Sequence, residues 1–407
     1  IGQGCNIEAN DGNIIHSTTE FDSNTIILPA AYAEQLIAEG YVVSEVVDGL
    51  IQVTGVAVAK IGTTKYTSLE AAFNEAQSGD EIVVLTDIIL PAKSENGAFE
   101  IAETVGNVTL NLNGFDITSS ERIGYTGRTN YAFDNYANLT IKGEGTITAR
   151  GIQNYGTLTI EGNDVTIISN DELVGNGACI WGYQGSATII KGGTFRGLAK
   201  GAGAINTEGS LEITGGTFSA DGKQDEGYHV YTIQCKGDNT VNTISGAAVS
   251  GGKHGVIAVT NGAELTINNV TATRAGVHGQ SGHVLYVADN GMLTINGGTF
   301  VNEDASAGST VISTQENSTT YVTDGTFTNQ GDANVISGVG TTTLTGGNYS
   351  KDVTNYCAAG YISQQNESGR WDVIVDPTIQ GEAMIAGVGY TTLEDAIAAA
   401  NPGAEIV

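Results

Sequence analysis

The stretch "LTINGGTF", residues 293–300, decides the fold. It begins with alternating apolar and polar residues, the pattern of a β-strand that buries one face. Two glycines then mark a corner, after which a second short strand begins. Variants of this phrase recur at intervals of roughly 19 to 30 residues, which indicates a repeat architecture. They begin at Leu139, Leu158, Ala187, Leu211, Leu265, Tyr321 and Thr342.

A further short strand lies between successive phrases, as in "GACIW", "HGVIAV" and "HVLYVA". One such coil cannot bury its own apolar side, but stacked coils can, each hydrogen-bonded to the next at about 4.8 Å. We therefore expect an all-β fold, a right-handed parallel β-helix solenoid, with a β-sandwich or a propeller as the alternative. Alternation predicts these inward side chains: Leu139, Ile141, Leu158, Ile160, Leu211, Ile213, Leu265, Ile267, Leu293 and Ile295.

A second repeat has a much longer period. "YTSLEAAFNEAQSGDEIV" (Tyr66–Val83) returns as "YTTLEDAIAAANPGAEIV" (Tyr390–Val407). Thr67 with Glu70, and Thr391 with Glu394, have the spacing of a capping box at the start of a helix. We expect the first helix, residues 67–78, to cover the open end of the solenoid. A predicted hairpin at residues 360–375 closes the other end.

The order of these elements predicts three segments. Residues 1–55 would be the end of a preceding repeat unit, with a strand and a hairpin about Asp48-Gly49. Residues 56–375 would form one complete β-helix unit, and residues 376–407 would begin a following unit. The chain is thus expected to be a window from a head-to-tail array.

The phrases Ile61–Ile88 and Gly346–Val375, together with the coils, carry a resemblance to a known family. The chain resembles the right-handed parallel β-helix proteins of the pectin-lyase-like superfamily, and most closely the repeated cell-surface proteins of gut-type bacteria. This resemblance implies an extracellular protein of a bacterial surface, often an adhesin or a filament.

Charge and composition exclude several classes of function. The formal net charge of −29 disfavours nucleic acid and anionic membranes as partners. No apolar run is long enough to span a membrane. The four cysteines do not form a disulfide framework or a metal-ligand pattern, and we expect buried thiols.

We expect a structural and adhesive module whose partners are neighbouring units or subunits, with a glycan or a host surface as ligand. A polysaccharide lyase or glycoside hydrolase is the first alternative, because the fold hosts such enzymes. No intact catalytic motif of those enzymes is found, so the sequence does not favour an enzyme. A self-assembling filament subunit is the second alternative.

The ligand-binding prediction centres on Trp181, which should point outward because Ile180 points inward. An outward indole with polar neighbours is a platform for a sugar ring. The alternative is that a neighbouring loop covers the ring. The predicted glycan-binding residues are Trp181, Tyr183, Asp171, Glu172 and Asn206.

Three histidines precede equivalent strands in consecutive coils, namely His229, His254 and His283. Stacked imidazoles are candidate ligands for a divalent metal. A register shift of one residue would separate them, and a structural or surface role is the alternative. No motif requires a cofactor; zinc at these histidines or calcium at the acidic loops would be the metals to test.

Overall fold

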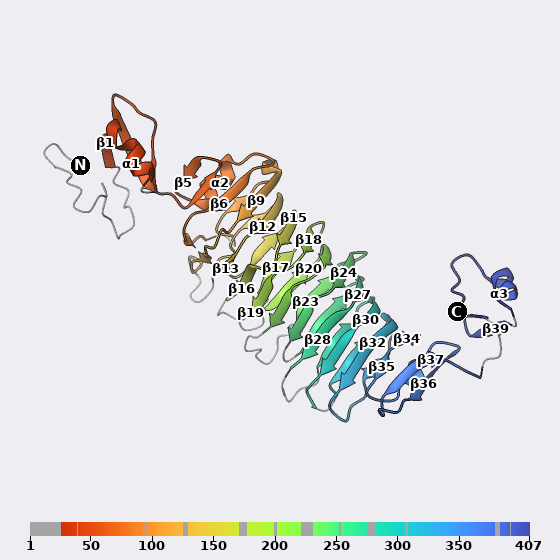
Figure 1. The fold of residues 1–407 in the computed structure, drawn as a ribbon. Helices are drawn as coiled ribbons and strands as arrows, with labels where there is room; N and C mark the ends of the chain where they lie inside the picture. The colour runs from red at the N-terminus through yellow and green to blue at the C-terminus, as the bar shows by residue number, and fades with distance from the viewer. Residues whose placement is uncertain are drawn as a thin grey trace.

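The computed structural model describes residues 26–38, 40–94, 97–124, 129–170, 177–198, 202–220, 231–251, 254–275, 282–305, 308–378, 383–390 and 392–407. Within them, short strands stack into a rod with a small helix near one end and a β-hairpin near the other (Figure 1). The predicted all-β parallel β-helix is therefore confirmed, and the sandwich and propeller alternatives are wrong.

Each coil contributes strands to three parallel sheets, which we number in chain order. Sheet 1 contains β6 (Glu81–Val84), β9 (Asn107–Asn111), β12 (Asn138–Lys142), β15 (Thr157–Glu161), β18 (Ala187–Ile190), β21 (Ser210–Ile213), β24 (Val241–Ser245), β27 (Glu264–Asn268), the first halves of β30 (Met292–Asn302) and β32 (Thr319–Asn329), and β34 (Thr341–Leu344).

Sheet 2 follows sheet 1 after a glycine-bearing corner. It contains β7 (Ile88–Leu90), β10 (Ile117–Ser119), β13 (Gly145–Ala149), β16 (Val165–Ser169), β19 (Thr194–Gly197), β22 (Thr217–Ala220), β25 (Ala248–Gly251), β28 (Val270–Arg274), the second halves of β30 and β32, and β35 (Asn348–Tyr349). The two long strands β30 and β32 continue around the corner, so they link sheets 1 and 2.

Sheet 3 carries the candidate site. It contains β8 (Glu100–Ile101), β11 (Asp134–Asn135), β14 (Ile152–Asn154), β17 (Ala178–Gly182), β20 (Gly203–Thr207), β23 (Tyr231–Lys236), β26 (Gly255–Thr260), β29 (His283–Val287), β31 (Thr310–Thr314) and β33 (Ile336–Ser337).

Aliphatic columns fill the rod. Leu139 pairs with Leu158 and Ile141 pairs with Ile160 on adjacent strands of sheet 1. The ten side chains predicted to point inward are all at most 2% exposed. Fully burying one aliphatic side chain contributes about 1.5–3 kcal/mol, so these columns are the main source of stability.

Aromatic rings stack inside the rod along sheet 2. The Phe195 and Phe218 ring centroids are 4.8 Å apart, and the planes differ by 5°. A second stack near the other end joins Phe300, Phe327 and Tyr349, with centroid separations of 5.0 and 4.8 Å. These separations match the strand spacing, because equivalent residues of successive coils lie directly over one another.

The helix α2 (Leu69–Glu75) packs Leu69 and Phe73 against the first coil, and both are 1% exposed. The predicted cap was wrong by one residue. Ser68, not Thr67, is the N-cap and accepts a hydrogen bond from the Ala71 backbone N–H. At the later helix the N-cap is Thr392, one residue beyond Thr391, which lies outside the described residues.

Two antiparallel hairpins lie where the sequence predicts them. The first joins β2 (Tyr41–Val43) to β3 (Leu50–Val56), and positive φ angles at Asp48 and Gly49 form its turn. β3 also pairs with β1 (Ile26–Pro29), which η1 (Ala30–Tyr32) and α1 (Ala33–Ala38) follow. The second joins β36 (Tyr361–Gln365) to β37 (Trp371–Val375), and β37 pairs with β35 to close the solenoid.

The long-period repeat is visible in the structure. β4 (Ala59–Ile61), β5 (Thr64–Tyr66) and α2 return as β38 (Ala383–Ile385), β39 (Val388–Tyr390) and α3 (Leu393–Ala399), with every bound shifted by 324 residues. The remaining short elements are η2 (Glu103–Val105) and η3 (Thr354–Tyr356). The division into segments 1–55, 56–375 and 376–407 stays a prediction.

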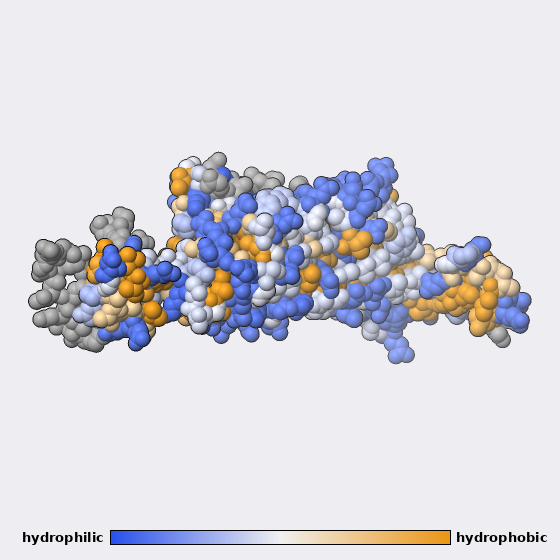
Figure 2. All heavy atoms as spheres, turned by 90° about the horizontal axis from the view of Figure 1, so that it is seen from above, coloured by the Kyte–Doolittle hydropathy of each residue, from blue (hydrophilic) through white to orange (hydrophobic). Residues whose placement is uncertain are grey.

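The two helices differ in what covers them. Leu393 and Ile397 of α3 stand where α2 has Leu69 and Phe73, but they are 52% and 59% exposed. Apolar surface accordingly gathers toward both ends of the molecule, whereas the middle of the rod is mostly polar (Figure 2). Within the described residues, no helix has the length and apolar character needed to cross a membrane.

Candidate functional site

The outer face of sheet 3 carries two columns of side chains that run along the rod. In the first column, Asp134 pairs with Gln153, Gln153 with Trp181, and Trp181 with Asn206. Glu100 precedes Asp134 in register, and Gln234 follows Asn206. The second column lies two residues further along each strand and contains Tyr136, Tyr155, Tyr183, Glu208 and Lys236. We call these eleven residues the sheet 3 strip.

Buried asparagines hold the turns that present the tyrosines. Asn135 and Asn154 are fully buried, and the Asn135 Nδ2 donates to Asn154 Oδ1 at 2.9 Å. Asn135 Nδ2 also donates to the carbonyl oxygen of Ala137, and Asn154 Nδ2 donates to that of Ala187. These bonds satisfy the backbone at the corner between sheets 3 and 1, so the residue after each asparagine is fixed on the outer face.

The three tyrosines form a continuous stack. The ring centroids of Tyr136 and Tyr155 are 4.6 Å apart with planes at 5°, and those of Tyr155 and Tyr183 are 4.2 Å apart at 9°. Burial raises the pKa of Tyr155 well above its usual range, and its hydrogen bond to Tyr183 adds to this. Tyr155 therefore stays neutral at physiological pH, and the stack presents phenol hydroxyls along the strip.

Trp181 points outward, as its position after Ile180 predicts, but its ring is not bare. The Lys236 ammonium lies 5.0 Å from the indole centroid, within range of a cation–π interaction. The Glu208 carboxylate lies 3.1 Å from the same ammonium. A charged side chain therefore covers one face of the indole.

Amide groups fill the spaces between the rings. Gln153 is 2% exposed, and its Nε2 donates to the hydroxyl oxygens of Tyr183 and Tyr155. Within the described part of the chain, Gln153 Oε1 and Asn206 Oδ1 are buried acceptors with no hydrogen-bond partner. An unpaired buried acceptor costs about 1–3 kcal/mol, so both oxygens favour a ligand that donates hydrogen bonds.

Asp134 is the most perturbed acid of the strip. Its carboxylate accepts from the Gly97 backbone N–H, and a Cβ at Gly97 would lie 2.7 Å from that carboxylate. Burial, reinforced by the charge of Glu100, raises the pKa of Asp134 to about 6. Asp134 Oδ1 has no hydrogen-bond partner among the described residues.

The structure brings together three of the five predicted glycan-binding residues. Trp181 and Asn206 are neighbours in the first column, and Tyr183 follows in the second. Asp171 and Glu172 lie outside the described residues. Sequence reasoning missed the acids, the amide and the two other tyrosines, although a signal existed: the dipeptide Asn-Tyr precedes the sheet 1 strand in both "DNYANLTI" and "QNYGTLTI".

The histidines do not form the expected ladder in the described region. His283 pairs with Gly255 rather than with His254, so the two imidazoles are one residue out of register. His229 lies outside the described residues. Among the residues that the structure describes, no three acidic, cysteine or histidine side chains come close enough to hold a metal ion.

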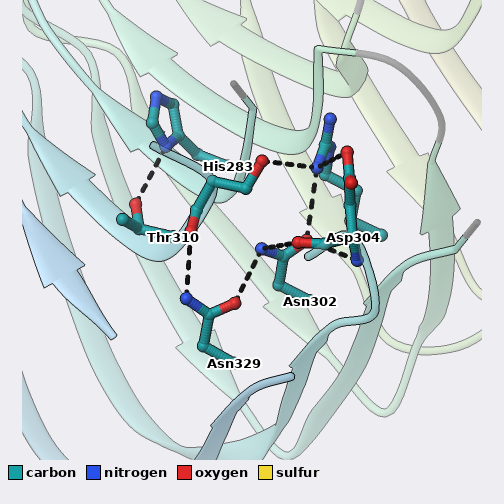
Figure 3. Close-up of polar contacts among 7 residues, drawn as sticks. His283, Asn302, Asp304, Thr310 and Asn329 are labelled. Carbon is teal, nitrogen blue, oxygen red and sulfur yellow. Dashed lines mark hydrogen bonds and ion pairs between the residues drawn. The ribbon is translucent and has the colours of Figure 1, made fainter. Parts of the chain in front are cut away.

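His283 belongs instead to a network at the corner between sheets 2 and 3. Its Nδ1 lies 2.9 Å from Thr310 Oγ1 (Figure 3). Burial, together with the charge of Arg274, lowers the pKa of His283 to about 4. The imidazole is therefore neutral at physiological pH and has a structural hydrogen bond.

A buried ion pair anchors the same corner. Arg274 Nη1 lies 2.8 Å from Asp304 Oδ2, and both side chains are fully buried. The guanidinium also donates to Asn302 Oδ1 and Ser309 Oγ at 3.3 Å. Asn302 in turn donates to Asn329 Oδ1 at 2.9 Å, which ties three coils together (Figure 3).

The described cysteines are free thiols. Cys179 and Cys235 are fully buried in the core, as predicted, and burial raises the pKa of each to about 12. Their thiolate fraction at neutral pH is negligible, so they serve as small apolar side chains.

The fold and this face define a parallel β-solenoid with a polar and aromatic strip on one sheet. No protein-family model, curated protein or solved structure matches the chain.

Proposed function

We propose that the chain is a structural and adhesive module of a bacterial cell-surface or extracellular repeat array, and that it binds glycans on the outer face of sheet 3. The sheet 3 strip is the observation that carries this proposal. The stacked tyrosines present ring edges and phenol hydroxyls to a sugar, and the Trp181 indole adds apolar surface. The amide and carboxylate oxygens accept hydrogen bonds from sugar hydroxyls.

The direction of the strip supports an extended ligand. Its residues lie on successive strands, so they repeat at about 4.8 Å along the rod. A linear oligosaccharide laid along the rod would meet one pair of strip residues at each strand. Such a ligand would cross several coils, and its binding would not require the chain to change shape.

The rod itself supports the structural part of the proposal. Each coil is hydrogen-bonded to its neighbours through three sheets, which makes the module stiff and leaves few unpaired strand edges for proteases. The exposed Leu393 and Ile397 support contacts with a neighbouring unit or subunit, head to tail. Electron microscopy of the purified chain would distinguish filaments from separate rods.

A glycan array tests the binding function. We expect the wild-type chain to bind a defined set of linear glycans, and Trp181→Ala and Tyr183→Ala to weaken that binding at least tenfold. Tyr321→Ala is the matched control, because Tyr321 is an exposed tyrosine on sheet 1. Wild-type chain that binds no glycan, or strip variants that bind as well as Tyr321→Ala, would refute the proposal.

An enzyme would act on the glycans it binds. Incubating the chain with any array hit and measuring new reducing ends or unsaturated products distinguishes a hydrolase or lyase from an adhesive module. The adhesive proposal predicts no product.

A further inference from the structure

One end of the sheet 3 strip already holds an ammonium group. Lys236 places its charge 5.0 Å from the Trp181 ring centroid and 3.1 Å from a carboxylate oxygen of Glu208. An aromatic ring and a carboxylate together stabilise a cation more than either does alone, because ring quadrupole and charge attract it from two sides.

The other end of the strip has the same two components but, among the residues that the structure describes, no ammonium. Tyr136 is 38% exposed, and one face of its ring stacks on Tyr155. The residue beside Tyr136 in the preceding coil is Ala102, as the pairing of Asn135 with Ile101 requires. Ala102 contributes only a methyl group beside the outer side of the tyrosine ring.

Two carboxylates lie next to this ring. Glu100 is exposed and pairs in register with Asp134, whose carboxylate is partly buried. Asp134 lies two residues before Tyr136 on the same outer face, and burial together with the charges of both acids raises the pKa of Tyr136. Neither acid forms an ion pair with another described residue.

The neighbouring amide adds an independent indication of a ligand. Gln153 is 2% exposed and adjoins Asp134 in the first column, yet its Oε1 has no hydrogen-bond partner in the described part of the chain. Acceptors and negative charge thus dominate this end, in a chain whose formal net charge is −29. The ligand that compensates them must donate hydrogen bonds and carry positive charge.

We propose that Tyr136, Glu100 and Asp134 bind the protonated amine of an amino-sugar oligosaccharide, in the way that Trp181 and Glu208 bind the Lys236 ammonium. The next sugars would lie over Tyr155 and Gln153 toward the middle of the strip. This inference rests on the proposed glycan-binding function and names the class of sugar that the site prefers.

Calorimetric titration with two matched ligands tests the inference. The ligands are a glucosamine oligomer with free amines and the same oligomer fully N-acetylated, at a pH just above the pKa of Asp134. We expect the free-amine oligomer to bind about tenfold more tightly, from one cation–π contact and one partly screened ion pair. The double variant Glu100→Gln, Asp134→Asn should abolish that preference, so that the two oligomers bind equally.

The matched control is Glu212→Gln, which removes an exposed carboxylate from sheet 1. It should keep the tenfold preference, and thermal melts should show that all variants fold. Spermidine separates charge from sugar recognition, because it carries amines without a sugar ring, and we expect it to bind more weakly than the free-amine oligomer.

Three results would overturn the inference: equal binding of the two oligomers, a preference that survives in the double variant, or spermidine binding as tightly as the free-amine oligomer. Binding of the N-acetylated oligomer alone would overturn the amine site but keep the glycan-binding function. If no glycan binds at all, the proposed function fails as well.

Discussion

Phe327→Ala removes the middle ring of the stack inside the solenoid. The side chain is fully buried between Phe300 and Tyr349, with both pairs of planes at 8°. Truncating a buried phenylalanine to alanine costs about 3–5 kcal/mol, and each lost ring pair adds about 0.5–1.5 kcal/mol beyond the buried area. Because these contributions overlap, we expect a loss of about 5 kcal/mol.

The loss should be local, because each coil of a solenoid contacts only its neighbours. We expect hydrogen–deuterium exchange to rise in β30, β32 and β35, while β12 and β15 keep their protection. Tyr321→Ala lies on the same strand but is 44% exposed, so it should change stability by less than about 0.5 kcal/mol. Urea unfolding followed by circular dichroism gives the free energies.

Two results would refute this reasoning. Phe327→Ala as stable as Tyr321→Ala would mean that the ring stack does not support the core. Exchange that rises equally in β12 and β15 would mean that the coils unfold as one unit rather than as coupled neighbours.

Three other changes test the corners of the rod. Asp304→Asn should destabilise the chain by about 3–5 kcal/mol in urea unfolding, because it leaves Arg274 buried without its counter-charge. The double variant Arg274→Met, Asp304→Leu should recover most of that loss, and a single variant as stable as wild type would contradict this. Because the pKa of His283 is low in the folded chain, the unfolded chain takes up a proton first as the pH drops from 6.5 to about 4, and the contribution of His283 to stability should fall over that range. His283→Gln should remove that part of the pH dependence of thermal unfolding. Gly151→Ala should lower the melting temperature far more than Gly162→Ala, because both glycines have positive φ but only at Gly151 would a Cβ collide with the backbone of the next coil. Equal melting temperatures would contradict the close approach of the two coils at Gly151.

The core could be predicted because strand periodicity is local. Leu265 and Ile267 alternate with polar residues, and any register that buries one buries the other. Trp181 was placed outward by the same reasoning from Ile180. Its neighbours Gln153 and Asp134 could not be found in this way, since which residues pair across coils depends on the lengths of the loops between them.

Errors of one residue mark the limits of local patterns. Ser68 and Thr67 both carry a hydroxyl, and the structure uses the one whose backbone is extended just before the helix. His254 precedes β26, whereas His283 is the first residue of β29, so their register differs by one residue and their side chains are placed differently. The Lys236 ammonium over Trp181 could be found only by placing three successive coils in register.

A crystal structure of the chain with a bound oligosaccharide chosen from the glycan array tests the central claim most directly. The account predicts electron density for the sugar along the outer face of sheet 3, against Tyr136, Tyr155 and Trp181, with the coils unmoved. Sugar bound on sheet 1 or sheet 2, or at either end of the rod, would contradict it.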